Sequence, residues 1–583
     1  RNIIIVSAGF SEDGAEGGRR EKKIKELAKR YRLNVLGPNC LGMMNSANNL
    51  NATFAKSEIK KGRAAFVSQS GAICSAALDW AQGKNFGFSK FVSLGNKAVL
   101  DENDFFEYFE KDRETDLVVA YLEEIEDGRK FMEVVSRLSK IKPVAILKAG
   151  QSEAGALAAM SHTGSIAGSN EAVLAGFKRT GVIVLENIEE MFDLLLFYSK
   201  HKKIKGDDVV LISNAGGPMV ATVDLLSKNG VSLNKFSREL VEELKETLPK
   251  IVKIKDPLDI IGDADAGRFK DAIEAVLEDK KVSNVLILLT PQTSTEVKKT
   301  AEIITSLAAH HKDKVIFTSF MGGKSVKNAK AILEKGGITN FDFPNKDVNM
   351  LTKIINYEND RKKLRVYKRI PAQEHKRRGE QLDYIETFKI LKKFGIPAVE
   401  THKVTGQNDL KIMSYPAVLK AVGKKIIHKT EKRAVALGIK NKQEAEKKLK
   451  ELKRILEDKS YCVSQPMVAG DIEMIVGFRR DRSFGPIIMV GMGGIYTEVF
   501  KDVQLGVDDI SNADIRDMIE KLKIYPILKG ARGKRGYNLK ILDKIISGVA
   551  RMAQKRRDIH ELDINPVILK GDKAIALDAR IVI

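Results

Sequence analysis

The residue with the clearest chemical potential is His162, which lies in the run Ser161-His162-Thr163-Gly164-Ser165-Ile166-Ala167-Gly168. No aromatic or charged side chain stands within several positions on either side, so a charged substrate can approach the imidazole closely. A neutral imidazole is a competent nucleophile toward phosphoryl groups, and backbone N–H groups of a glycine-containing turn can hold the transferred phosphate. The run therefore predicts a phosphorylated histidine. A surface loop whose histidine only caps a neighbouring group is the alternative.

Two further groups follow predicted strands in the same region. Ser70 and Gly71 come directly after the first strand of a regular series, where a serine cap and free N–H groups at a helix start make an anion site. Glu123 and Glu124 follow the third strand, where a carboxylate can orient an imidazole and fix its tautomer. An ordinary helix cap and a solvated acidic loop are the alternatives.

The last third of the chain carries residues suited to a nucleotide. Lys420 ends a short apolar strand, a position that suits a nucleotide phosphate. Gln465, Met467 and Val468 belong to a strand interrupted by proline, whose backbone groups could meet an adenine, and Glu473 is a possible ribose partner. A lysine that reaches solvent and a plain edge strand are the alternatives.

Near the end of the chain, two oxygen-bearing side chains stand on adjacent predicted strands. Asn565 and Asp578 can hold Mg²⁺ between them beside a triphosphate, because Mg²⁺ prefers oxygen ligands and needs only one or two from the protein. A turn Asn-Pro and a strand-end aspartate are common, so each is a weak signal alone. A glycine-rich run that includes Gly493 and Gly494 lies between apolar residues upstream.

Regular strand–helix alternation positions the His162 run. Between about Gly62 and His201 it predicts a parallel sheet covered on both faces, with strands at Ala64–Ser68, Lys90–Leu94, Leu117–Leu122, Val144–Leu147 and Val182–Leu185. A second α/β alternation begins at Gly206 and ends in a charged helix near Arg365. The fold class is therefore α/β.

At 583 residues the chain should divide into about four domains. We expect boundaries at 1–58, 59–203, 204–370 and 380–583, with a polar linker before the last part. The first part resembles the back half of a nucleotide-binding α/β domain, and its buried strand at the first residues suggests that further chain precedes it. Asn39 and Cys40 lie beyond a strand end, where such sheets bind ligands. A small core residue is the alternative for Cys40.

Composition limits the classes of protein. Hydrophobic residues make up 43% and charged residues 30%, and no apolar run approaches membrane-spanning length, which predicts a soluble globular protein. Three cysteines, far apart and without metal-ligand spacing, favour a reducing cytoplasm. The net charge of +22 lacks any nucleic-acid-binding signature and would instead attract anionic nucleotides and coenzymes. We expect no nucleic-acid partner and no membrane.

Taken together, these stretches resemble one family. The order of SQSG, YLE, SHTGSIAG, VLKAVGKKIIHKT, GMGGIYTEVFKDV, ELDINPVIL and ALDAR is similar to that of the NDP-forming acyl-CoA synthetases, in particular the ADP-forming acetyl-CoA synthetases, relatives of succinyl-CoA synthetase. The resemblance covers essentially the whole chain. It implies a Rossmann-like remnant, two flavodoxin-like domains and a C-terminal ATP-grasp domain.

The resemblance also implies a reaction and its substrates. Acyl-CoA, ADP and phosphate would give acid, coenzyme A and ATP through acyl phosphate and phosphohistidine intermediates, with acetate as the default acid and Mg²⁺ as cofactor. Succinate, an aryl acid or a branched acid is the alternative substrate. A non-catalytic regulatory protein that binds coenzyme A and nucleotide is the alternative of a different class. A homodimer or higher homo-oligomer is expected.

Site residues carry over one by one. His162 matches the phosphorylated histidine, and Glu123 matches its supporting glutamate, because the family reads Tyr-aliphatic-Glu-Gly there. The other matches, in chain order, are Asn39 and Cys40 near the coenzyme A thiol, Ser70 and Gly71 at the first phosphate site, Lys420 at nucleotide, His428 as a second phosphate carrier, Gly493 and Gly494 at the second phosphate site, and Asn565 and Asp578 at Mg²⁺.

The sequence departs from the family in two places. Most of the coenzyme A domain, including its glycine-rich adenosine site, is not in the chain. After His428-Lys429-Thr430 the acidic residue is kept as Glu431, but Lys432-Arg433-Ala434 follows where the family has Val-Gly-Gly. A stiffer or differently charged loop around His428 is therefore expected.

Overall fold

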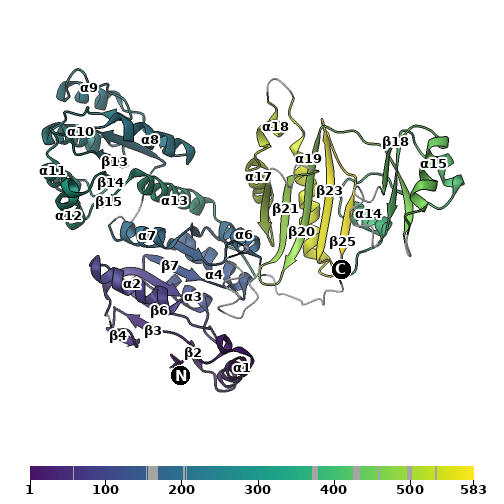
Figure 1. Ribbon diagram of the computed structural model, residues 1–583, viewed down its shortest axis with the longest axis horizontal. Helices are drawn as coiled ribbons and strands as arrows, with labels where there is room; N and C mark the ends of the chain where they lie inside the picture. The colour runs from purple at the N-terminus through teal and green to yellow at the C-terminus, as the bar shows by residue number, and fades with distance from the viewer. Residues whose placement is uncertain are drawn as a thin grey trace. The chain divides into compact units, whose positions relative to one another are not determined.

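The computed structural model describes residues 1–56, 58–152, 154, 169–200, 204, 206–369, 379–423, 434–456, 460–494, 502–531 and 535–583. Within these residues the chain forms two compact units. The first comes from Arg1–Glu124, Lys130–Ala167 and Thr180–Tyr367, and the second from Ile125–Arg129, Gly168–Arg179 and Lys368–Ile583. The predicted α/β fold class is confirmed (Figure 1). None of the described helices is both long enough and apolar enough to cross a membrane.

A two-stranded parallel sheet opens the first unit. Strand β1 (Asn2–Ile4) pairs with β2 (Asn34–Leu36), and helix α1 (Gly14–Tyr31) connects them. The helix ends where Arg32 adopts the left-handed conformation and its N–H bonds the Ala28 carbonyl. This strand–helix–strand unit matches the Rossmann-like remnant expected from the sequence.

A seven-stranded sheet follows, in the order β4-β3-β6-β5-β7-β8-β9. Its parallel strands are β5 (Lys60–Ser68), β6 (Gly87–Ser93), β7 (Leu117–Leu122), β8 (Val144–Lys148) and β9 (Ile183–Leu185). Its helices include α2 (Gly71–Gly83), α3 (Glu102–Lys111), α4 (Gly128–Ile141) and α7 (Ile188–Lys200), whereas α6 (Asn170–Thr180), which follows β8 in the chain, belongs almost entirely to the second unit. The central strands are buried, as expected of a parallel sheet covered on both faces.

One part of this sheet differs from the expectation. Strands β3 (Gly42–Asn45) and β4 (Leu50–Thr53) form an antiparallel hairpin that pairs with β6, so residues we assigned to the first domain complete the sheet of the second. The hairpin is rich in asparagine and lacks a continuous apolar run, because it lies at the sheet edge, where residues need not be buried on both faces.

The third sheet of the first unit is entirely parallel, in the order β11-β10-β13-β14-β15, with β12 beside β10. Its strands are β10 (Asp208–Ser213), β11 (Ser232–Leu233), β12 (Leu258–Asp259), β13 (Asn284–Leu289), β14 (Val315–Phe320) and β15 (Thr339–Phe341). Its helices are α8 (Gly216–Lys228), α9 (Arg238–Thr247), α10 (Ala266–Glu278), α11 (Val297–His310), α12 (Lys327–Lys335) and α13 (Pro344–Lys363). It is the second flavodoxin-like domain.

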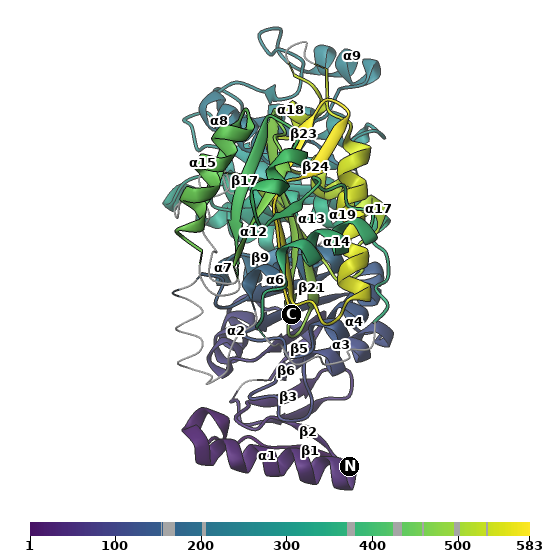
Figure 2. The same ribbon diagram turned by 90° about the vertical axis from the view of Figure 1, so that its right-hand side faces the viewer.

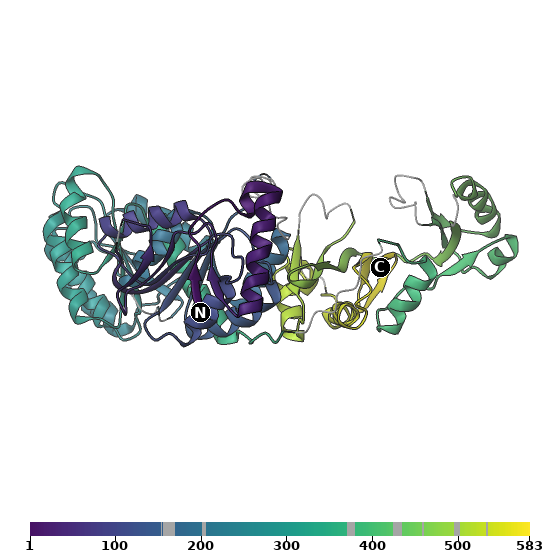
Figure 3. The same cartoon turned by 90° about the horizontal axis from the view of Figure 1, so that it is seen from below.

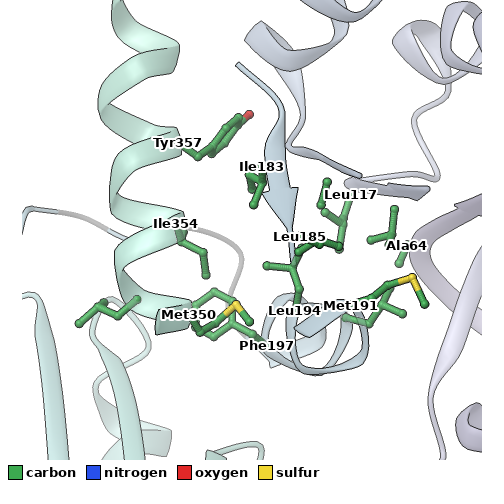
Figure 4. Packing of buried hydrophobic residues seen from close by; sticks show 14 of the residues in the cluster. Ala64, Leu117, Ile183, Leu185, Met191, Leu194, Phe197, Met350, Ile354 and Tyr357 are labelled. Atoms are coloured by element: carbon green, nitrogen blue, oxygen red, sulfur yellow. The ribbon is translucent and has the colours of Figure 1, made fainter. Parts of the chain in front are cut away.

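Helices α7 and α13 join the two large sheets through one continuous core. Figure 4 shows α13 side chains facing α7 and the strands of the seven-stranded sheet. Phe197 of α7 stacks on Phe317 of β14, with ring centroids 5.3 Å apart, and the Tyr357 hydroxyl donates to the Ser139 carbonyl at 2.8 Å. Each fully buried large apolar side chain contributes about 1.5–3 kcal/mol. The shared core therefore holds the two sheets as one body.

The second unit contains two antiparallel sheets. The smaller is ordered β16-β19-β17-β18, from β16 (His402–Val404), β17 (Ala417–Val422), β18 (Val435–Ile439) and β19 (Tyr461–Pro466). The larger is ordered β22-β21-β20-β23-β24 with β25 beside β23, from β20 (Ile472–Asp481), β21 (Gly485–Met492), β22 (Val503–Val507), β23 (Glu561–Lys570), β24 (Lys573–Ala576) and β25 (Ala579–Val582). This is the predicted ATP-grasp domain.

Helices cover each of these sheets. Helix α19 (Leu539–Lys555) packs on β20 and β21 and contacts α17 (Asn512–Glu520), and Figure 2 shows α19 beside α17. Helix α15 (Lys442–Lys453) packs on the smaller sheet, which forms the green lobe at the end of the second unit in Figure 3. Helix α14 (Tyr384–Lys393) contacts β25 of the larger sheet. Short helix α18 spans Tyr525–Lys529.

Candidate functional site

At the carboxyl edge of the seven-stranded sheet, the side chain of Gln69 holds the loop after β7. Its Oε1 accepts hydrogen bonds from the N–H groups of Glu123 and Glu124, the second at 3.0 Å. Its Nε2 donates to the Glu124 carbonyl at 3.4 Å, and Lys97 Nζ donates to the same carbonyl at 2.8 Å. The backbone that carries Glu123 is therefore fixed by side chains from two neighbouring loops.

A buried cation lies beside these carboxylates. Lys148 is the last residue of β8, and its neighbour in register on β7 is Leu122, directly before Glu123. Burial lowers the pKa of Lys148, while the carboxylates of Glu123 and Glu124 oppose that shift. Positive charge at this edge suits an approaching phosphoryl group.

Ser70 and Gly71 form the helix start predicted from the sequence. The Ser70 Oγ accepts from the Ile73 N–H at 3.3 Å and caps α2, and a side chain added at Gly71 would meet no atom within 4 Å. Within the described part of the chain, the N–H groups of Gly71 and Ala72 have no acceptor. This open helix N-terminus lies directly after Gln69, so the anion site and the Glu123 loop share one segment.

In the second unit, Lys420 lies between the two sheets. It is buried within β17, which continues to Val422 rather than ending at Lys420 as predicted, and it donates to the carbonyl of Leu577, between β24 and β25, at 2.8 Å. Its Nζ is 3.7 Å from Asp578 Oδ2 and 3.5 Å from the Tyr384 hydroxyl. The fold thus brings together Lys420 and Asp578, which are 158 positions apart in the sequence.

Asn565 lies next to Asp578. The Asn565 N–H donates to the Asp578 carbonyl at 3.2 Å, and Asn565 Oδ1 accepts from the Gly494 N–H at 3.5 Å. An amide oxygen and a carboxylate at adjacent strand positions fit Mg²⁺, which takes its remaining ligands from phosphate and water. The described residues contain no group of three or more His, Cys, Asp and Glu placed to hold a metal, so a site here would rest on these two.

Gly493 and Gly494, which directly follow β21, are tightly packed. Gly494 has a φ of +65°, and a side chain there would come within 2.2 Å of Glu473 Oε2. The Gly493 N–H donates to the Glu473 carbonyl at 2.8 Å, and a side chain at Gly493 would strike the backbone of Met474 at 2.8 Å. Only glycine fits at these two positions. The Gly494 N–H is also the group that donates to the Asn565 side chain.

The strand interpreted as an adenine-binding hinge is β19. Gln465 is buried there, and its Nε2 donates to the Thr401 hydroxyl at 3.0 Å and to the Tyr384 hydroxyl at 3.4 Å. Its side chain therefore belongs to the same group of contacts as Lys420, Tyr384 and Asp578, called the Lys420–Asp578 cluster below. Met467 is exposed just beyond the strand and Val468 is half-buried, while the Met467 N–H bonds the Pro416 carbonyl at 2.9 Å.

In the turn after β2, the two predicted ligand residues Asn39 and Cys40 differ in their exposure to solvent. Asn39 is exposed, with a φ of +55°, and its side chain donates to Asn96 Oδ1 at 3.3 Å. The Cys40 thiol is buried and lies 3.4 Å from the Ile5 carbonyl oxygen, and burial raises its pKa to about 11. The Cys40 geometry fits the alternative of a small core residue, and Asn39 is the side chain open to a ligand.

Both histidines of the prediction, His162 and His428, lie outside the residues that the structure describes. Sequence reasoning missed Lys97, Lys148 and Tyr384, and it passed over Gln69 although that residue lies inside the SQSG motif. A glutamine between two motif serines was a usable signal. Nothing in the sequence marked Tyr384, which only follows a helix cap.

Three known domain families match consecutive parts of the chain. Residues 61–198 match the succinyl-CoA ligase like flavodoxin domain, residues 209–363 the ligase-CoA domain, and residues 373–583 the ATP-grasp domain. The contacts of Gln69 with the Glu123 loop lie in the first of these domains, and the Lys420–Asp578 cluster lies in the third.

Whole-chain relatives share this order. The acetate–CoA ligase [ADP-forming] I of Archaeoglobus fulgidus is 37% identical over all of this chain and 86% of its own length. The 4-hydroxybutyrate–CoA ligase [ADP-forming] of Nitrosopumilus maritimus is 34% identical over all of this chain and 87% of its own. Among solved structures, acetyl-coenzyme A synthetase 1 of Ca. Korarchaeum cryptofilum, in complex with phosphate and ADP, is 32% identical. It matches 62% of this chain and 79% of that one with a TM-score of 0.60.

Proposed function

This chain belongs to the family of ADP-forming acyl-CoA ligases, and we propose that it catalyses the reversible reaction acyl-CoA + ADP + phosphate ⇌ acid + CoA + ATP. The observation that carries the proposal is the presence, on one chain, of two separate phosphate-suited sites. One is the Ser70 helix start beside Glu123, and the other is the cluster of Lys420, Asn565 and Asp578. A phosphoryl carrier between them is the role proposed for His162.

At the first site, phosphate attacks the thioester carbonyl of acyl-CoA, which forms acyl phosphate and releases the coenzyme A thiol. The neutral His162 imidazole then attacks the phosphorus, and the P–O bond to the acyl group breaks to give the free carboxylate. The N–H groups of Gly71 and Ala72, at the start of α2 that Ser70 caps, hold the anion. Glu123, held by Gln69, accepts a hydrogen bond from the second ring nitrogen and fixes the tautomer.

At the second site, the phosphohistidine transfers its phosphoryl group to a terminal oxygen of the ADP β-phosphate, and His162 returns to the neutral form. Lys420 and the Gly493-Gly494 turn bind phosphate oxygens, and Asn565 and Asp578 hold the Mg²⁺ that accompanies ADP. Mg²⁺ neutralises charge on the phosphates. Gln465, Met467, Val468 and Glu473 are proposed to line the nucleoside end. His428 is proposed as a second carrier, and Asn39 and Cys40 as neighbours of the coenzyme A thiol.

Acetate is the acid we propose, and the Archaeoglobus relative supports it, whereas the Nitrosopumilus relative is named for 4-hydroxybutyrate. We propose a homodimer or higher homo-oligomer that acts in the cytoplasm without a nucleic-acid or membrane partner. The test is ADP-dependent phosphate consumption with a panel of acyl-CoAs. Acetyl-CoA should give the highest kcat/KM. A preference for succinyl, aryl or branched acyl-CoA would change the acid, and no consumption with any of them would contradict the reaction.

We expect Glu123→Gln to slow phosphorylation of His162 from ATP while the fold stays intact. Glutamine keeps the shape but not the charge, and a charge-assisted hydrogen bond is worth roughly 1.5–3 kcal/mol, or about one to two decades in rate if all of it appears in the transition state. Rapid-quench phosphoenzyme formation measures this rate. Glu124→Gln is the matched control, because both N–H groups bond the same Gln69 oxygen. A loss confined to Glu124→Gln would move the role by one residue, and wild-type rates in Glu123→Gln would contradict it.

A further inference from the structure

We infer that Tyr384 is a positioning residue of the nucleotide site, whose hydroxyl links Lys420, Gln465 and Asp578 and keeps the Asp578 carboxylate directed for Mg²⁺-ADP. This inference rests on the proposed function, because it names a further residue of the proposed nucleotide site. None of the sequence motifs includes Tyr384. It reaches the cluster only because α14 packs on β25.

Three polar groups meet the Tyr384 hydroxyl. Lys420 Nζ lies 3.5 Å from it and Gln465 Nε2 lies 3.4 Å from it, and the hydroxyl is hydrogen-bonded to the Asp578 carboxylate. Tyr384 is only 5% exposed, and Lys420 and Gln465 are also buried. The hydroxyl is therefore enclosed by the side chains of the proposed site.

The bonding capacity of a phenol decides the direction of these contacts. A tyrosine hydroxyl has one hydrogen to donate and can accept two hydrogen bonds. Ammonium and amide N–H groups can only donate, so Lys420 and Gln465 use the acceptor capacity. The one hydroxyl hydrogen is then left for Asp578, which as a carboxylate can only accept. All three partners are satisfied in a single arrangement, which fixes both ends of the Lys420–Asp578 pair.

The ring itself is held in place at the first position of α14. Asp383 caps this helix, accepting from the N–H groups of Ile385 at 2.9 Å and Glu386 at 3.1 Å. The Tyr461 hydroxyl donates to Asp383 Oδ2 at 2.6 Å, and the Tyr384 ring packs on Phe388 with centroids 5.0 Å apart. The hydroxyl is aimed by a capped helix start rather than by a free side chain.

Removing the hydroxyl takes one partner from each charged end of the cluster, while Lys420 keeps the Leu577 carbonyl at 2.8 Å. The Asp578 carboxylate would keep the Ala579 N–H at 2.8 Å and the Lys420 ammonium at 3.7 Å. Lys420 and Asp578 would then be drawn into a closer ion pair, since each has lost a partner. That pair competes with Mg²⁺ for Asp578. A loss specific to the metal-bound nucleotide follows.

The test is calorimetry of Tyr384→Phe, which retains the ring and its packing. Affinity for Mg²⁺-ADP should fall about tenfold, as expected for one charge-assisted hydrogen bond, whereas affinity for ADP in EDTA should change by less than about twofold. Tyr415→Phe is the matched control, because it loses a hydroxyl bond in the same domain, to the Leu410 carbonyl at 3.1 Å, and is not among the contacts of the Tyr384 hydroxyl. It should leave both affinities near wild type.

A double-mutant cycle separates positioning from general loosening. If Tyr384 acts through Asp578, then Tyr384→Phe should have little further effect on Mg²⁺-ADP affinity in an Asp578→Asn background. Equal losses with and without Mg²⁺, fully additive effects, or an unchanged Tyr384→Phe protein would each overturn the inference. Failure of the wild-type protein itself to bind Mg²⁺-ADP would instead overturn the proposed nucleotide site, so the two failures are distinguishable.

Discussion

His162→Ala is expected to take up no phosphoryl label at position 162 from ATP and Mg²⁺, whereas the wild-type protein should become labelled there in an acid-labile, base-stable form. The imidazole is the proposed nucleophile, and alanine offers no atom that can accept the phosphoryl group. Gel analysis after incubation with labelled ATP measures the uptake. We expect the label at position 162 to fall to background, the largest effect of any single change in this protein, and any label that remains to lie on the proposed second carrier His428.

His310→Ala is the matched control for the label. His310 is exposed at the end of α11, where its ring nitrogen lies 2.9 Å from the Ser306 carbonyl oxygen, in the ligase-CoA domain rather than at either proposed site. It should label as the wild type does. Label of undiminished intensity in His162→Ala would remove His162 as the carrier and make His428 the next residue to test.

Asp578→Asn should weaken Mg²⁺-nucleotide binding more than Asn565→Ala does. Asp578 supplies the formal charge of the proposed metal site and Asn565 only a neutral carbonyl oxygen, so we expect a loss of about one to two decades in affinity for Asp578→Asn and about one decade or less for Asn565→Ala. Calorimetry with Mg²⁺-ADP measures both. Acyl-phosphate formation at the first site should survive both changes, because Glu123 and Ser70 lie in another domain.

Asp572→Asn provides the control for the charge change alone, since Asp572 is an exposed residue that pairs with Arg535 at 3.4 Å. Its affinity for Mg²⁺-ADP should match the wild type. Unchanged affinity in Asp578→Asn would mean that the metal is held elsewhere, with Glu498 or Asp563 as the next candidates.

Much of the fold could be predicted because buried strands and helix caps leave local signals. Strand β7 has the bounds expected from its apolar run, and Ser70 caps α2 where a helix start was expected. The hairpin of β3 and β4 could not be predicted in this way. Its pairing with β6 is a tertiary contact, and its sequence has no apolar alternation strong enough to reveal it.

The residues of the candidate site also fall into two groups, those that the local sequence reveals and those that it does not. Ser70 could be found because a helix cap is a local feature, and Lys420 and Asp578 because each stands in or just after a short apolar strand, although β17 continues past Lys420 to Val422. Gln69 and Tyr384 could not be assigned roles, since their partners lie 54 to 55 and 36 to 194 positions away. Only folding brings such groups together. The roles of residues that position a binding side chain are therefore not visible in the sequence, even where the binding side chain itself can be predicted.

The most direct measurement of the central claim is a chase of isolated phosphoenzyme. The full-length protein is labelled with [γ-³²P]ATP and Mg²⁺, freed of nucleotide, and divided between ADP alone and acetate with coenzyme A. One histidine phosphate that serves two sites predicts that both chases discharge the label, as ATP in the first and as inorganic phosphate with acetyl-CoA in the second. Label that leaves with ADP but persists through acetate and coenzyme A would contradict the proposed relay.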